Sequence, residues 1–204
     1  MSAGSKTKTR IITLRTLYSD MPSSTFTINE SITMRLLVEQ DANVVFSAIK
    51  ENRSRLREWL VWVDDTQSVA DTTKFIKNAA VEFETSKAFR FGIFYSNQYA
   101  GIVDLHEIDL KNSRGYIGYW LDQKYEGKGI MSAAVKKILE FGFEELKLHR
   151  IEIHVAPNNL KSRAIPERLG FKFDGQLREF EWIHDGKYLD TQIYSLLRSE
   201  WISK

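Results

Sequence analysis

Hydrophobic residues recur every three or four positions in four segments of the chain, a spacing that is typical of amphipathic helices. Asp41 precedes the first segment and is expected to cap it, and Gly170 ends the last one in the manner of a glycine C-cap. The predicted helices cover 42–52, 68–87, about 129–145 and 158–170. Segment 55–63 brings two leucines and two tryptophans together and is predicted as a short helix or loop.

The hydrophobic period changes to two in the remaining segments, which indicates strands. A tight turn near Ser96 and Asn97 joins two of them, and residues 184–187 form the turn of a C-terminal hairpin. The predicted strands are 31–39, 88–95, 98–108, 114–122, 149–156, 171–183 and 187–197. The resulting order, β-α-α-β-β-β-α-β-α-β-β, predicts one mixed α/β domain with a mostly antiparallel start and a βαβ unit in the middle.

The composition suits one globular domain, because 204 residues with 43% hydrophobic and 27% charged side chains can bury a substantial core. The absence of cysteine excludes disulfides, thiolate metal ligands and a cysteine nucleophile. No apolar run is long enough to span a bilayer. The four histidines lack ligand spacing, so no metal is expected.

The first twenty residues differ in composition from the rest, since they hold four basic side chains and only one acidic one. This leader fits an organellar transit peptide, a start upstream of Met21, or a flexible tail, and the last two readings are favoured. We expect a flexible extension over 1–27 and a folded domain over 28–204. The whole chain carries a formal charge of +2, so the domain is nearly neutral and shows no nucleic-acid footprint. A cytoplasmic protein is predicted.

The stretch "DQKYEGKGIM" (122–131) places Gly127 and Gly129 between a predicted strand and a predicted helix. A helix N-terminus presents unpaired N–H groups, and glycines let the backbone approach an anion closely, so the stretch suits a phosphate or pyrophosphate. Lys124 and Lys128 add positive charge. A Walker loop would need Ser or Thr after the lysine, and a dinucleotide fingerprint would need glycine in place of Ser132. A plain strand-to-helix turn remains the alternative.

A second motif, "NNLKSRAIPERLGF" (158–171), follows about thirty residues later, after one more predicted strand. Together with "GYWLDQKYEGKGIMSAAV" and the opening "ITMRLL", it makes residues 28–198 resemble the GNAT superfamily of N-acetyltransferases. The nearest likeness is to the branch of bacterial ribosomal-protein N-terminal acetyltransferases. The resemblance implies a single α/β (α+β) domain, in which helices flank a mixed, mostly antiparallel sheet with a central splayed parallel strand pair.

The resemblance also implies acetyl-CoA as co-substrate, with the loop from Lys124 to Gly129 around its pyrophosphate. The first loop position is Lys instead of the family's Gln or Arg. The pantetheine arm would enter the splay beside the preceding strand, and a main-chain N–H near Leu121 would bind the oxyanion. The implied cofactor-binding residues are Trp120, Leu121, Lys124, Tyr125, Glu126, Gly127, Lys128, Gly129, Ile130, Asn159 and Ser162.

Two catalytic residues are implied in the same way. Ser162 matches the serine that would protonate the departing thiolate, although Ser162 and Asn159 could equally be helix caps. Pro166 has no N–H to offer the carbonyl of Ser162, so that carbonyl could stay free. Glu181 matches a glutamate that would assist deprotonation of the amine, and an outward-facing strand charge is its alternative. Second-line bases on a neighbouring strand are Asp104, His106 and Glu107.

Segment 52–65 is the expected wall of the acceptor site, with Trp59 and Trp62 shaping a groove and Asp64 and Asp65 attracting a cationic amine. Ordinary core aromatics and a solvated loop are the alternative. The predicted function is acetyl transfer to a protein N-terminal α-amine by direct attack in a ternary complex. A small-amine acetyltransferase for polyamines, amino sugars or antibiotics, and a non-catalytic acyl-CoA-binding module, are the competing hypotheses. A homodimer is plausible by resemblance.

Overall fold

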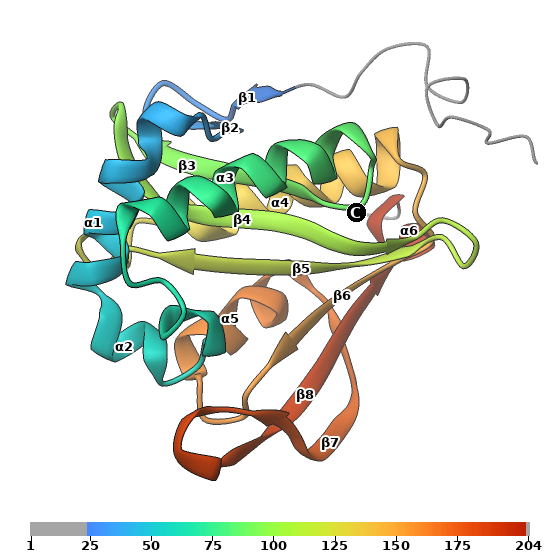
Figure 1. Cartoon of the computed structure of the whole chain (residues 1–204). Helices are drawn as coiled ribbons and strands as arrows, with labels where there is room; N and C mark the ends of the chain where they lie inside the picture. The colour runs from blue at the N-terminus through green and yellow to red at the C-terminus, as the bar shows by residue number, and fades with distance from the viewer. Residues whose placement is uncertain (1–23, 203–204) are drawn as a thin grey trace, which may run out of the picture.

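The structure, a computed structural model, describes residues 24–202, whose strands form one sheet in the order β1-β2-β3-β4-β5-β6-β8-β7 (Figure 1). Neighbouring strands pair antiparallel except β5 and β6, which pair parallel. The strands are β1 (Thr25–Thr27), β2 (Ile32–Leu36), β3 (Phe89–Tyr95), β4 (Gln98–Asp109), β5 (Arg114–Leu121), β6 (Arg150–Val155), β7 (Lys172–Trp182) and β8 (Tyr188–Leu197).

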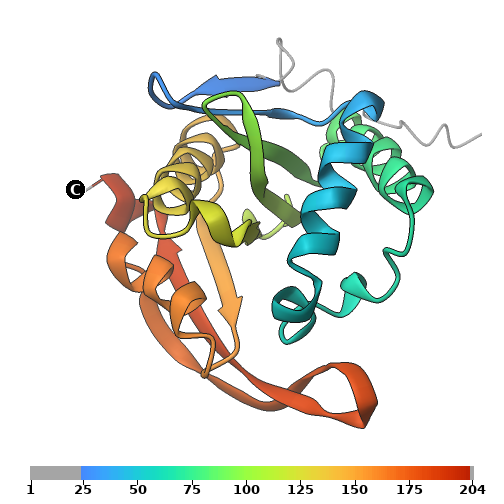
Figure 2. The same cartoon turned by 90° about the vertical axis from the view of Figure 1, so that its left-hand side faces the viewer.

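Helices cover both faces of this sheet, with α4 and α5 on one side and α1, α2 and α3 on the other (Figure 2). The α-helices are α1 (Ala42–Glu51), α2 (Arg53–Arg57), α3 (Val69–Glu84), α4 (Ile130–Glu140), α5 (Leu160–Leu169) and α6 (Arg198–Ile202). Short helical turns are η2 (Glu39–Asp41), η3 (Val61–Val63), η4 (Gln123–Tyr125), η5 (Phe141–Glu145, a π turn that extends α4) and η6 (His184–Gly186). The predicted fold class is confirmed.

The predicted helices are confirmed, but one of the predicted caps is wrong. Gly170 ends α5 in the left-handed region at φ 77°, as expected. Asp41, however, does not cap α1. Its carboxylate accepts a hydrogen bond from the N–H of Val38 at 2.8 Å and pairs with Arg35 at 2.7 Å. The side chain is drawn back toward the preceding strand because the guanidinium offers two parallel donors.

The folded part of the chain starts earlier than the expected boundary at residue 28. Thr25–Thr27 forms β1 and pairs with β2. Phe26 is buried there, with its ring edge-on to the rings of Phe91 at 5.2 Å and Phe141 at 5.8 Å. The predicted leader, residues 1–20, lies outside the described residues. Within 24–202, no helix has the length and apolar character needed to cross a membrane.

The parallel strands β5 and β6 stay paired over only three residues, Arg114 to Tyr116 with Arg150 to Glu152. Both strands continue beyond that point, to Leu121 and Val155, without pairing further with each other, and Figure 1 shows them diverging. The predicted splay is therefore confirmed. Because side chains alternate along a strand, β5 sends Ile117 and its alternate neighbours toward α4 and α5, and sends Trp120 to the opposite face.

Candidate active site

The loop between β5 and α4 presents backbone to an open space. Gly127 and Gly129 have φ angles of 74° and 73°, and Gly129 is the N-cap of α4. A Cβ built on either glycine would meet no atom within 4 Å. The first turn of α4 leaves N–H groups without partners inside the helix, and these carry partial positive charge. The loop therefore has the room and the donors that a pyrophosphate requires.

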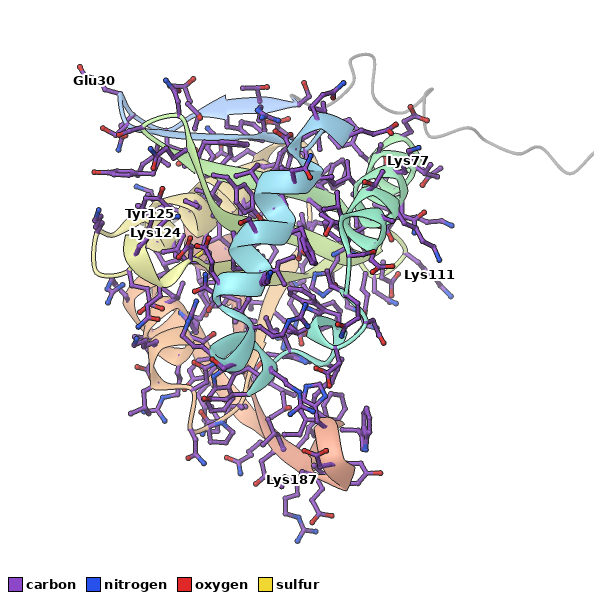
Figure 3. All side chains as sticks on the ribbon, turned by 60° about the vertical axis from the view of Figure 1, so that its left-hand side comes forward. Glu30, Lys77, Lys111, Lys124, Tyr125 and Lys187 are labelled. Atoms are coloured by element: carbon purple, nitrogen blue, oxygen red, sulfur yellow. The ribbon has the colours of Figure 1, made fainter. Side chains whose placement is uncertain are left out.

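The two loop lysines are held by neighbouring groups. The ammonium of Lys124 lies 3.0 Å from the carboxylate of Asp122 and 5.1 Å from the ring centre of Tyr125; Figure 3 shows the two labelled residues together. Lys128 lies over the rings of Tyr95 and Tyr125, at 5.0 and 5.6 Å. Tyr125 is buried and its hydroxyl donates to Gln98. The ammonium groups of Lys124 and Lys128 thus pack over tyrosine rings, and the buried Tyr125 supports the loop from the protein interior.

Asp122 anchors the start of this loop. Its carboxylate accepts from the N–H of Lys124 at 3.2 Å and so caps η4. Burial raises the pKa of Asp122, but the neighbouring ammonium of Lys124 and the amide of Asn52 outweigh burial, so the pKa is lower than usual. The carboxylate is therefore ionised at neutral pH and holds Lys124 in place.

Glu126 links the loop to two helices, α2 and α5, which cover opposite faces of the sheet. Its carboxylate pairs with Arg55 of α2 at 3.0 Å and with Lys161 of α5 at 2.6 Å. Arg55 also donates to the carbonyl of Leu121 at 2.6 Å. The next residue, Asp122, bonds its N–H to the carbonyl of Ala100 at the start of β4, so the N–H and C=O of Leu121 point away from β4, toward the splay. That N–H remains the predicted oxyanion donor.

Ser162 meets an unpredicted partner, Tyr119 of β5. The Tyr119 hydroxyl donates to the carbonyl of Ser162 at 2.9 Å, and the Ser162 hydroxyl lies 3.2 Å from the same phenol oxygen. Burial raises the pKa of Tyr119 and outweighs the opposing hydrogen bond from Ser162, so the phenol stays protonated. Pro166 explains this contact, because it leaves the Ser162 carbonyl without a partner inside the helix. Tyr119 and Ser162 together form a pair of hydroxyls able to pass a proton.

Three predicted cofactor residues point their side chains elsewhere. Asn159 caps α5 by accepting from the N–H of Ser162 at 3.2 Å. Trp120 is buried on the opposite face of the sheet, 6.5 Å from the ring of Trp62, and Ile130 is buried in the core beneath α4. For Trp120 and Ile130, only the main chain remains available to a cofactor.

An acidic and aromatic hollow lies between η3 and the tip of the β7–β8 hairpin. Glu181 is exposed on β7, and the buried His184 lies with its Nδ1 2.8 Å from Asp64. Asp64 also pairs with Arg57 at 2.8 Å. The hollow is lined by Val61, Asp64, Asp65, Phe180, Glu181, Trp182 and His184. Asp64, Asp65 and Glu181, predicted separately from the sequence, are thus brought together, whereas neither Trp59 nor Trp62 lines the hollow, and Trp62 packs against the core instead.

Two of the second-line bases, Asp104 and His106, form a different cluster on β4, whereas Glu107 is exposed at the irregularity of that strand. Asp104 is buried and binds Arg90 at 2.8 Å and His106 at 2.7 Å, and it also accepts from the N–H of Gly118 at 3.1 Å. These bonds engage both oxygens of the Asp104 carboxylate. Among residues 24–202, no three His, Asp or Glu side chains gather closely enough to hold a metal ion.

The comparison with protein families matches residues 31–172 to the acetyltransferase (GNAT) domain. The chain belongs to this family. A Bacillus subtilis (strain 168) protein named putative ribosomal N-acetyltransferase is 38% identical over 176 residues, which cover 85% of this chain and 95% of that protein. The ribosomal-protein-serine acetyltransferase of Escherichia coli (strain K12) is 27% identical over 85% of this chain and 96% of its own length.

A solved structure gives the same result for the fold. The microcin C7 self-immunity acetyltransferase, determined with acetyl-CoA and AMP, superposes with a TM-score of 0.81 at 28% identity, covering 88% of this chain and 99% of that one. The protein is therefore an acetyl-CoA-dependent N-acetyltransferase. The open glycine loop at the N-terminus of α4 and the splay between β5 and β6 fit the pyrophosphate and the pantetheine arm.

Proposed function

We propose that this enzyme acetylates the N-terminal α-amine of a protein, as the ribosomal-protein acetyltransferases do. The observation that carries the proposal is the likeness to such enzymes over nearly their whole length, including the serine acetyltransferase of E. coli. The alanine acetyltransferase of ribosomal protein uS5 from the same organism is 26% identical over 90% of this chain. The hollow beside the β7–β8 hairpin supports the proposal, because its carboxylates attract an ammonium group.

The chemistry favours an α-amine over a lysine. An α-amine has a pKa of about 7.7–8.0 and a lysine amine one of about 10.4, so the α-amine is far more often neutral near pH 7. Its nitrogen attacks the thioester carbon directly within the ternary complex. In this proposal the N–H of Leu121 binds the oxyanion, and the Tyr119–Ser162 pair, whose hydroxyl oxygens lie 3.2 Å apart, gives a proton to the departing sulfur.

A small amine is the second candidate acceptor. The related microcin immunity enzyme was solved with AMP, a small ligand that carries an aromatic base. Phe180 and Trp182 in the hollow are each 52% exposed and offer aromatic surface to such a group. A non-catalytic acyl-CoA-binding module is the third possibility, and it would keep the glycine loop without turnover.

Release of free thiol from acetyl-CoA, measured across an acceptor panel, separates these functions. The panel holds peptides that begin with Ser or Ala, the same peptides with blocked N-termini, a polyamine, an amino sugar and an aminoacyl nucleotide. We expect release with the free peptides and not with the blocked ones. Release with a small amine alone would assign the second function, and coenzyme binding without release on any acceptor would assign the third.

The proposal also includes a cellular location and an oligomeric state. A ribosomal acceptor is consistent with the cytoplasmic location predicted from the sequence. The predicted homodimer would have the C-terminal strands as its surface, since β7 is an edge strand with Phe173 and Phe180 exposed. Sedimentation at several protein concentrations would test the dimer.

A further inference from the structure

His154 stands beside the splay, on the face of the sheet away from α4 and α5. The last paired residues of the parallel strands are Tyr116 and Glu152, so His154, two residues farther along β6, is level with Gly118 where the strands diverge. Ile153 and Val155 are buried in the core beneath α4. Because side chains alternate along a strand, His154 projects to the opposite face, at the level of the Tyr119–Ser162 pair across the sheet.

A carboxylate fixes the imidazole of His154. Its Nε2 lies 2.8 Å from the Oε2 of Glu152, and Arg150 binds the other oxygen of that carboxylate at 2.7 Å. A carboxylate accepts hydrogen bonds, so Nε2 carries the proton and Nδ1 keeps its lone pair. Nδ1 makes no hydrogen bond with any described residue, and 27% of the side chain is exposed. His154 therefore presents a free proton acceptor at the splay.

The surroundings of the ring are aromatic. The ring of Tyr116 lies edge-on at 5.1 Å from β5, and Phe180 of β7 lies at 6.3 Å. His106 of β4 stacks near the Tyr116 ring at 6.2 Å and is itself bound to Asp104. Glu152 and its partner Arg150, from the same strand, are thus the charged groups in direct reach of His154.

We propose that His154 accepts the proton of the acceptor amine and that Glu152 is the positioning residue that holds it. This inference rests on the proposed acetyl transfer. The ammonium gives one proton to Nδ1, and the neutral nitrogen forms the N–C bond as the C–S bond breaks. The nitrogen then loses its second proton to water, the Tyr119–Ser162 pair gives one proton to the thiolate and regains one from water, and Nδ1 releases its proton to water, so one proton is released in total.

Glu181, the base suggested by sequence resemblance, lies farther out in the sheet than His154. On β8 the partner of His154 is Ile193 and the partner of Glu181 is Leu189, four residues farther on. At about 3.4 Å per residue this separation is roughly 13 Å along the strand, and β7 lies one strand farther out in the sheet. Because His154 is level with Gly118, the same four residues bring Glu181 level with the end of β5 near Leu121, so its position along the strands does not exclude it. Glu181 is the rival base, and the Glu181→Gln variant below distinguishes it from His154.

The decisive experiment measures kcat/KM against pH with a peptide that begins with Ser. Loss of a general base costs about 100-fold or more, so we expect a deficit of that size for His154→Gln at pH 7. The deficit should shrink as pH rises above the α-amine pKa of about 8, because the amine then becomes neutral unaided. Glu152→Gln should show a smaller deficit with the same dependence on pH, and both variants should bind acetyl-CoA like the parent.

His149→Gln is the matched control, since His149 is exposed at the start of the same strand and bonds only through its backbone. It should match the parent at every pH. Parental activity of His154→Gln at pH 7, a deficit equal at all pH values, or a deficit linked to pH in Glu181→Gln instead would each overturn the proposal. Should the parent acetylate only a polyamine, the proposed acceptor fails, and the same variants compared on that amine still decide the role of His154.

Discussion

Gly129→Ala is the substitution that tests the cofactor loop most cleanly. Gly129 has a φ of 73° and is the N-cap of α4, and an added Cβ would meet no protein atom within 4 Å. The folded protein therefore bears only the strain of a left-handed alanine, about 1–2 kcal/mol. For a domain of this size, each kcal/mol corresponds to a fall in Tm of about 2–4 °C.

The effect on coenzyme binding should be larger than the effect on stability. The new methyl group occupies the open space from which a pyrophosphate would approach the N–H groups of α4. Loss of one hydrogen bond to a charged group costs about 1.5–3 kcal/mol, which is roughly a 10- to 150-fold increase in Kd. Isothermal titration of the apoprotein with coenzyme A measures this Kd, and a thermal scan of the same sample measures the strain.

Gly186→Ala supplies the matched control. Gly186 has a φ of 71° and equally open surroundings, but it lies in η6 at the tip of the β7–β8 hairpin, next to Lys187 in Figure 3. It should lose similar stability while its Kd for coenzyme A stays at the parental value. If Gly129→Ala binds coenzyme A as tightly as Gly186→Ala does, the loop is a structural turn and the reasoning is refuted.

Three other substitutions probe the remaining contacts. Tyr119→Phe should lower kcat about 10- to 100-fold with little change in KM for acetyl-CoA. Steady-state kinetics measure both constants, and a parental kcat would contradict the role of Tyr119 with Ser162. Arg55→Ala leaves the Leu121 carbonyl without its donor and leaves Glu126 with Lys161 as its remaining partner, so Tm should fall by several degrees and KM for acetyl-CoA should rise; unchanged Tm and KM would refute the role of Arg55. Burial raises the pKa of Asp41, but the hydrogen bonds from Arg35 and from the N–H of Val38 outweigh burial, so the pKa is lower than usual. The ionised carboxylate thus stabilises the fold above about pH 4, its usual pKa region, and that stability is lost as pH falls through the lowered pKa. In urea titrations, Asp41→Asn should be less stable than the parent at pH 7, and the difference should close as the pH falls below about 4; a difference that stays constant would be evidence against the pairing.

The main elements could be predicted because their signals are local. Periods of 3.6 and 2 marked the helices and strands, and the two motifs indicated the order of the central βαβ unit. Strand β1 was missed because three residues, Thr25–Thr27, are too few to show a period. Asp41 was assigned as a cap because residue type and position suit that role, whereas its orientation depends on Arg35, six residues earlier.

The site was harder to predict because its decisive contacts join distant segments. Arg55 and Glu126 are 71 residues apart, and Tyr119 and Ser162 are 43 apart. No local pattern pairs such residues. Tyr119 could have been suspected on one ground, since alternation along β5 places it on the same face as Leu121, toward the cofactor side. The contact between His154 and Glu152 could also have been predicted from the sequence, because residues two apart on a strand share a face.

The central claim is that this enzyme moves the acetyl group of acetyl-CoA to a protein α-amine. The most direct test is fragment mass spectrometry of a peptide that begins with Ser and contains one internal lysine, after incubation with acetyl-CoA and the enzyme. The account predicts one added acetyl group, located on the N-terminal residue, and no acetylation of the same peptide with a blocked N-terminus. An acetyl group on the lysine alone would contradict it. So would a peptide that stays unmodified although the same enzyme releases thiol from acetyl-CoA with a small amine.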